Sequence, residues 1–434
     1  NARWLCLYKV QPFFILDVFF MRQIFTVALL IISVLHVSGQ RNEILNDRIA
    51  SLQVVAGDDW LSMPVISLHG STPIYISFDD LTHDYIRYCY KLEHCEADWT
   101  PSTQLFASDF CEGFAEGNTI DDLAQSINTN TLYTHYRLQL PNPQCKFKMS
   151  GNYKLTVYDG NDEDDVAFVA YFMVVEPRMG VGLRVLTNTD VDVNNRHQQV
   201  EMDLRYNDVA RISDWQRQIK TVVLQNGRWD NAVWNPQPQY ITHEGLRWIH
   251  CRDLIFDGGN EYRKFEMLDM THTTMGLENI NWDGRNYHAY VWTDEPRKSY
   301  IYDEDANGAF YIRNSDNQEN DVISDYAIVH FRLQIPEQTD DVYINGVWTN
   351  DQFVPKYRME YLNADGSYQL ALPLKEGYYS YQYLLVDSEG KARSLPTEGD
   401  FFQTENTYQG LVYYRGNGDR TDRLVGYQSI KFKL

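Results

Sequence analysis

Cysteine is scarce in this chain: six occur in 434 residues, and no two are separated by only two to four residues. Cysteine pairs at that spacing are the usual sign of a structural zinc site, so we expect none. Five cysteines follow residue 40, and in an exported protein an odd number leaves at least one thiol unpaired. The spacing leaves open whether one bridge forms among the first four or none, and the connectivity is not fixed. The five are Cys89, Cys95, Cys111, Cys145 and Cys251.

Long apolar runs are also missing, with one exception at residues 21–40. There Arg22 precedes an apolar stretch, and small residues stand where a signal peptidase would cut. A transmembrane helix is the alternative, but the stretch is about half the length that a hydrocarbon core requires. We therefore predict a signal peptide cleaved near Gln40, with no lipid anchor because no cysteine follows. Residues 1–20 are interpreted as an upstream extension, so residues 1–40 are left out of the fold prediction.

The common catalytic motifs are absent. The sequence contains no Gly-x-Ser-x-Gly elbow, no His-Glu-x-x-His pair and no glycine-rich phosphate loop. His243 and Glu244 begin like a zinc-protease helix, but Gly245 follows and the second histidine is missing. No pair of carboxylates stands out for glycoside hydrolysis. We predict that the protein is not an enzyme, with no catalytic residues, no metal ligands and no cofactor.

One acidic segment, residues 303–308, begins like a calcium loop. Its twelfth position is Asn314, where a bidentate carboxylate is expected. Strand-like residues lie before it at 300–302 and after it at 309–312. This context favours a hairpin with an Asn-Gly turn over a calcium site.

The charge balance is strongly acidic, with 60 acidic and 38 basic residues and a net charge of −22. Such a surface repels phosphate-rich partners, which argues against binding to nucleic acid or to anionic lipid head groups. After residue 40 no second apolar run is long enough to cross a membrane.

What the sequence does contain is alternation, with tyrosine or another large apolar residue at every second position. Gly and Asn-Gly or Asp-Gly turn signals separate the alternating segments, and no long stretch has a helical period; residues 119–127 are expected to form one or two helical turns at most. An all-β fold follows. The predicted strands include residues 73–78, 85–92, 133–140, 153–158, 200–206, 287–292, 326–333 and 378–386.

Two segments resemble joints between domains: a Pro/Gly segment at 174–182 and a polar run at 314–321. They divide the chain after residue 40 into pieces that each suit one β-sandwich. We predict three successive immunoglobulin-like or early-set-like β-sandwiches after the signal peptide. Their ranges are 41–177, 178–317 and 318–434, preceded by residues 1–40.

Trp99 follows the strand that contains Tyr88 and Leu92, at a point where the chain turns. It is expected to be buried and to close the bottom of the first core. The third piece is similar in its order of motifs to early-set modules that include starch- and glycogen-binding domains. Its aromatic residues predict either a sugar platform or a core, and sugar binding is the weaker interpretation.

Short motif segments lie at 64–68, 88–95 with 98–99, 130–136, 148–155, 172–177, 222–230, 256–265, 305–308 with 310–312, and 325–333. Taken together, these segments resemble one family, the Plug protein of the bacteroidete type IX secretion system. The sequence GGNEYR at 258–263 is the most specific element, and the resemblance extends over nearly all of the chain after residue 40.

The resemblance implies a non-enzymatic periplasmic protein at the outer membrane. Such a protein would bind the periplasmic opening of the giant outer-membrane β-barrel translocon and seal it between transport events. Successive β-sandwiches suit a rigid, exported stopper. The alternative is an exported carbohydrate-binding or adhesin-like protein, which rests on the third piece and on the 31 tyrosines and 10 tryptophans.

Overall fold

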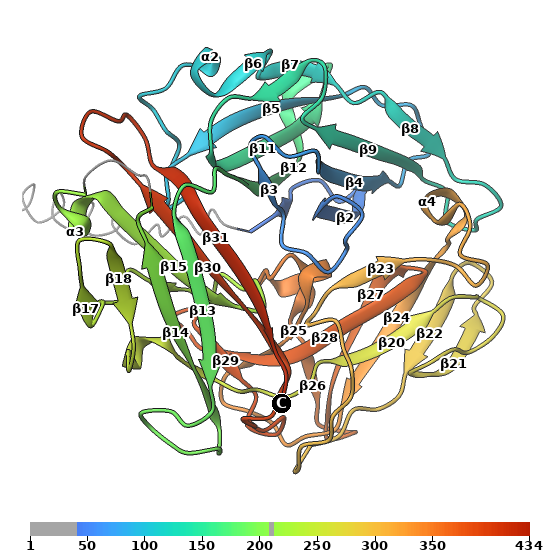
Figure 1. The fold of residues 1–434 in the computed structure, drawn as a ribbon. Helices are drawn as coiled ribbons and strands as arrows, with labels where there is room; N and C mark the ends of the chain where they lie inside the picture. The colour runs from blue at the N-terminus through green and yellow to red at the C-terminus, as the bar shows by residue number, and fades with distance from the viewer. Residues whose placement is uncertain (1–40, 208–211) are drawn as a thin grey trace, which may run out of the picture. The chain divides into compact units, whose positions relative to one another are not determined.

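The structure, a computed structural model, describes residues 41–207 and 212–434. Nearly all of its regular structure is β (Figure 1). The strands fall into three groups, each with its own buried core, which we call the first, second and third strand sets. The all-β prediction is therefore confirmed. The predicted signal peptide lies outside the described residues.

The first strand set consists of two sheets that enclose one core, and most of their strand pairs are antiparallel. Phe78 occupies its centre, 5.2 Å from the ring of Tyr88 and 4.8 Å from that of Phe168. One sheet contains β1 (Glu43–Ile44), β3 (Val65–Ser67), β5 (Tyr88–Cys95), β7 (Glu116–Thr119), β11 (Gly151–Asp159) and β12 (Asp162–Val175). The other contains β2 (Ile49–Ala56), β4 (Ile74–Asp80), β8 (Asp122–Gln125) and β9 (Thr134–Leu140). Short elements α2 (Ala107–Phe110), β6 (Cys111–Gly113) and β10 (Cys145–Phe147) complete it.

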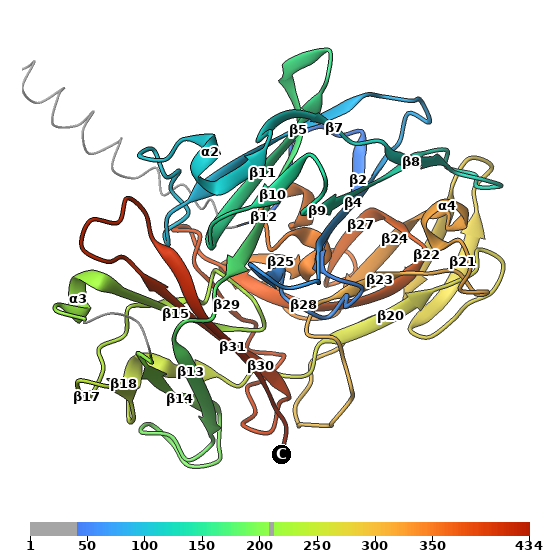
Figure 2. The same ribbon diagram turned by 45° about the horizontal axis from the view of Figure 1, so that its top comes forward.

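The second strand set draws on two distant parts of the chain. One sheet contains β13 (Gly180–Leu186), β14 (His197–Arg205), β17 (Tyr240–Ile241), β18 (Gly245–Trp248) and β19 (Ile255–Asp257). The facing sheet contains β15 (Ile219–Gln225), β16 (Val233–Trp234), β30 (Asn406–Tyr414) and β31 (Arg423–Phe432). Helices α3 (Trp215–Gln218) and η1 (Arg252–Leu254) belong to this set. Figure 2 shows the last two strands beside β15.

The third strand set lies between those two parts in the sequence. One sheet contains β20 (Arg263–Met267), β23 (Phe310–Ile312), β25 (Asp341–Asn345), β28 (Gly377–Val386) and β29 (Ala392–Ser394). The other contains β21 (Leu277–Trp282), β22 (Tyr287–Val291), β24 (Tyr326–Leu333), β26 (Glu360–Leu362) and β27 (Ser367–Lys375). Its short helices are α4 (Asn320–Ile323), η2 (Val347–Thr349) and η3 (Pro355–Tyr357).

The expected ranges 178–317 and 318–434 do not correspond to these sheets. Strand β20 pairs with β28, so the third set begins well before residue 317. Strand β30 pairs with the whole length of β15, so the end of the chain returns to the second set. A local polar run such as 314–321 marks a loop, but it does not reveal which distant strands share a sheet.

The predictions of individual strands were more accurate than the predicted domain ranges. All eight predicted strands are present within a few residues of their expected ends. The prediction of helical turns at residues 119–127 is wrong, because this range contains the end of β7 and all of β8. The Asn307-Gly308 turn is present, with positive φ at both residues. The predicted hairpin around it is wrong, because β23 pairs with β28 and residues 300–302 form no strand.

Candidate functional site

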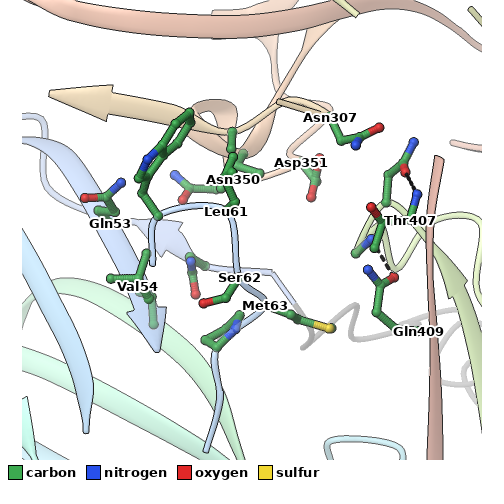
Figure 3. Close-up of a pocket in the computed structure, with 18 of the residues that line it drawn as sticks. Gln53, Val54, Leu61, Ser62, Met63, Asn307, Asn350, Asp351, Thr407 and Gln409 are labelled. Carbon is green, nitrogen blue, oxygen red and sulfur yellow. Dashed lines mark hydrogen bonds between the residues drawn. The ribbon is translucent and has the colours of Figure 1, made fainter. Parts of the chain in front are cut away.

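All three strand sets contribute to one cavity, of about 230 Å³. The segment after β2 and its neighbours form one wall, including Leu61, Ser62 and Met63 (Figure 3). Across the cavity lie Thr407 and Gln409 on β30. Because its walls come from residues more than 350 positions apart in sequence, the cavity depends on the three sets keeping their relative positions.

The third strand set supplies the most polar part of the lining. Asn307, Asn350 and Asp351 lie together along one side of the cavity (Figure 3). Aromatic side chains lie among the other lining residues, namely Trp60, Trp99, Tyr171 and Trp229. Aromatic faces combined with amide groups suit the binding of a partly polar group, and neither is a nucleophile.

Two lining carboxyls have shifted pKa values. Burial, with the nearby Asp230 carboxylate, raises the pKa of Asp351 to about 6, although Asn345 donates a hydrogen bond to it at 2.8 Å. Burial also raises the pKa of Asp305 to about 7, despite hydrogen bonds from the backbone N–H groups of Asn307 and Tyr262. Both carboxyls therefore exchange protons near neutral pH.

Some buried polar atoms at the cavity have no hydrogen-bond partner among residues 41–207 and 212–434. They are the indole Nε1 of Trp99 and the side-chain oxygens of Asn307 and Asn350. An unpaired buried polar atom costs free energy unless water or another group satisfies it. These three atoms are where such a group would bind.

The contact between the first and third strand sets is built around a buried carboxylate, Asp79. The Lys375 ammonium lies 2.6 Å from one of its oxygens, and the Tyr326 hydroxyl donates to that oxygen at 2.7 Å. His135 lies 2.6 Å from the other oxygen. Asp79 and Lys375 are both almost fully buried. Ser51 extends the network, with its hydroxyl 2.7 Å from that of Tyr326.

Opposing effects act on the pKa of Asp79. Burial disfavours its charged form, but the Lys375 ammonium and the hydrogen bonds from His135 and Lys375 outweigh burial and lower the pKa. Burial also lowers the pKa of Lys375, and the neighbouring Asp79 carboxylate, 2.6 Å away, opposes this shift. The pair therefore joins the two sets as an ion pair.

The contact between the first and second sets has a hydrophobic cluster of its own. Trp99 is only 5% exposed and packs against Trp229, with ring centroids 5.4 Å apart. The prediction that Trp99 is buried is confirmed, but it lies between two sets and not at the bottom of the first core. At the edge of the cluster Asp422 is paired with Lys220 at 2.8 Å and accepts a hydrogen bond from the Ala97 N–H.

The sequence-based search named no catalytic, metal or cofactor residues, and no group of three or more potential metal ligands occurs in 41–207 and 212–434. Of the aromatic residues that raised the sugar-binding alternative, Trp348, Tyr379, Tyr381 and Tyr383 are buried in the third core. The cavity and Asp79 were missed. Alternation makes Asp79 one of two consecutive carboxylates at a strand end, and nothing local indicates its distant partner.

Comparison with known proteins gives a family match and a close structural relative. A family model described as "Type 9 secretion system plug protein 1st domain" matches residues 49–176, which correspond to the first strand set. No curated protein matches the chain.

A crystal structure of a hypothetical protein from Parabacteroides merdae is similar over 91% of this chain and 99% of its own, with 40% identity and a TM-score of 0.88. A marsupial T cell receptor structure covers 88% of this chain and 99% of its own, at 8% identity and a TM-score of 0.16. The second likeness is too weak to carry an argument. The first shows that the whole arrangement of strands is shared with a solved structure.

Proposed function

This chain belongs to the type 9 secretion system plug protein family, and from that premise we propose that it is a non-enzymatic plug. In this role it binds the periplasmic opening of the outer-membrane β-barrel translocon of that system and seals it. The observation that carries the proposal is the family match over residues 49–176. The proposed location is the periplasm, in peripheral association with the outer membrane.

The way in which the strand sets are joined supports a stopper. The third set is inserted between two halves of the second, so the chain passes from the second set to the third and back again. The first set contacts both through buried side chains, including Asp79 and Trp99. Because its strand sets are joined in this way, the protein should resist deformation. A plug that closes a translocon needs such rigidity.

Among the described residues, no helix has the length and apolar character needed to cross a membrane. Attachment to the translocon is therefore proposed to occur through contact with the barrel protein. The sugar-binding alternative loses part of its motivation, because Trp348, Tyr379, Tyr381 and Tyr383 of the third set are buried in its core.

The barrier function of the outer membrane tests the proposal. In a strain that lacks this protein, an unsealed translocon should admit large antibiotics that the outer membrane normally excludes. Restoring the gene should restore exclusion, including with the half-buried Asp351 replaced by Asn, because no single carboxyl performs chemistry. An intact barrier together with a growth defect on one polysaccharide would overturn the plug and favour the sugar-binding alternative.

A further inference from the structure

Two cysteines of the first strand set lie in direct contact. Cys111 begins β6 and Cys145 begins β10, and these strands form a separate antiparallel ribbon in which Cys111 is opposite Phe147 and Cys145 is opposite Gly113. Their sulfur atoms are 2.9 Å apart. Both side chains are buried, with 3% and 0% of their surface exposed.

We propose that Cys111 and Cys145 form a disulfide bond once the protein has been exported. The proposal rests on the periplasmic location argued above, because disulfides persist in the periplasm and are rare in the cytosol. Sulfur atoms already in contact need only a small shift to reach bonding distance. The periplasm permits a disulfide, and the short distance between the sulfur atoms identifies Cys111 and Cys145 as the pair.

The ribbon is the part of the first set that would benefit from a covalent bond. It has only two strands of three residues each, and an isolated two-stranded ribbon is marginally stable in water. Two residues beside the cysteines, Phe110 and Phe147, pack against the buried Tyr153, with ring centroids 6.1 and 4.9 Å away. Opening the ribbon would thus expose one end of the first core, and the bond would prevent this.

Among the five cysteines of the described chain, Cys111 and Cys145 are the one pair whose sulfur atoms are in hydrogen-bonding contact. Cys95 lies in the hydrophobic cluster between the first and second sets. Cys251 lies in the core of the second set, with its sulfur 3.8 Å from the carbonyl oxygen of Gln237. Cys89 is buried on β5, near Gly160. These three thiols are expected to remain reduced.

Oxidation requires an electron acceptor, and the proposed one is the disulfide of a periplasmic thiol–disulfide oxidoreductase. While the ribbon is open and its thiols are accessible, the Cys111 thiolate attacks a sulfur of the oxidant. This step gives a mixed disulfide and releases one oxidant thiolate. The Cys145 thiolate then attacks the Cys111 sulfur and releases the second. The protein loses two electrons and two protons, and the oxidant becomes a dithiol.

Counting thiols in protein isolated from the cell envelope tests the pair. The protein is denatured and treated with N-ethylmaleimide, with or without prior reduction. Three of the cysteines after residue 40 should be alkylated without reduction and all five after it. Five alkylated cysteines without reduction would overturn the proposal.

Peptide mapping identifies the partners. Cleavage after Lys and Arg places Cys145 in residues 138–146, and Cys111 together with Cys95 in residues 92–137. A further cut after Glu96 separates Cys95 from Cys111. The linked peptide should retain 138–146 joined to the fragment that contains Cys111. A link that contains Cys95 would contradict the assignment.

Variants provide a second readout. In Cys145→Ser one more thiol should be alkylated without reduction, and reductant should no longer lower the Tm as it does in the wild type. Cys251→Ser is the matched control and should keep both the link and the effect of reductant. If Cys145→Ser fails to fold, the thiol count of the wild-type protein still decides the question. A wild-type Tm that is unaffected by reductant, together with an intact link, would refute the stabilising role of the bond.

Discussion

The first strand set contacts its two neighbours in different ways. Towards the second set it uses a hydrophobic cluster around Trp99, with charged groups at the edge. Towards the third set the described residues form no shared hydrophobic cluster, and the contact centres on the ion pair of Asp79 and Lys375. The first contact thus adds ion pairs, such as Lys220 with Asp422, to a shared hydrophobic cluster. The second combines a fully buried ion pair with aromatic contacts, such as Tyr133 with Tyr326 at 5.6 Å. The two contacts should respond differently to mutation and to pH.

The contact between the first and third sets also contains a carboxyl with a raised pKa, that of Glu376. Burial and the neighbouring Asp325 carboxylate raise the pKa of Glu376 to about 7, although the Asp325 N–H donates to it at 3.0 Å. Asp325 in turn accepts hydrogen bonds from the backbone of Asn130 and Thr131 in the first set. Glu376 is thus linked, through Asp325, to the contact between the first and third sets.

The largest effect is expected from truncation after residue 403. Removing β30 and β31 leaves the sheet of β15 with two of its four strands and removes Leu411 and Tyr413 from the hydrophobic cluster. The second set should then fail to fold, so protease should rapidly cleave residues 178–258. Protection of that range in the truncated chain would show that the second set does not depend on the returning strands.

Next in size is Lys375→Ala. It leaves the Asp79 carboxylate buried without its ammonium partner, which should lower the free energy of unfolding by about 3 to 5 kcal/mol. Urea denaturation followed by circular dichroism measures the change. The exposed Lys391→Ala is the control and should change stability by at most about 0.5 kcal/mol. The double variant Asp79→Asn, Lys375→Met should recover part of the loss. If it were no more stable than Lys375→Ala, the unpaired Asp79 charge would not be the cause of the destabilisation.

Trp99→Ala should cost about 3 kcal/mol, as large aromatic truncations in a core do. The lower end of the usual range is expected because the indole also lines the cavity and so is not packed on every side. The same denaturation experiment measures it, with the exposed Trp292→Ala as the control. If Trp99→Ala and its control unfold at the same urea concentration, the hydrophobic cluster contributes little to the contact.

The smallest effect is the pH dependence of Glu376→Gln. A carboxyl with a raised pKa stabilises the folded state below its unfolded pKa of about 4.3, and this stabilisation is lost as pH rises towards 7. Glutamine keeps the acceptor and does not titrate. Relative to the wild type, the variant should therefore gain about 1 to 3 kcal/mol between pH 4 and pH 8. The exposed Glu389→Gln should show no such trend, and a parallel pH profile for Glu376→Gln would exclude the role of its carboxyl.

Alternation predicted the strands because every second side chain of a half-buried strand must be apolar, as in residues 326–333. It could not predict that β30 pairs with β15, since pairing across nearly 190 residues leaves no local trace. We propose a revised division: 41–177, then 178–258 with 404–434, and 259–403 inserted between them. The truncation above tests it.

The cavity could not be predicted from the sequence, for the same reason. Its walls include Ser62, Asn307 and Thr407, which no spacing rule connects. Trp99 could be predicted as buried from its position after a strand, but its partner Trp229 belongs to another set. The family resemblance, in contrast, depends on many short segments at once and survives without knowledge of the pairing.

The central claim is that this protein binds the translocon barrel, and affinity purification from detergent-solubilised outer membranes tests it most directly. A tagged copy carrying residues 1–434 should recover one very large outer-membrane β-barrel protein in near-equal molar amount, identified by mass spectrometry. Lys375→Ala, which loosens the contact between the first and third sets, should recover less than the Lys391→Ala control. Recovery of no large barrel protein from membranes that contain the intact translocon would contradict the account.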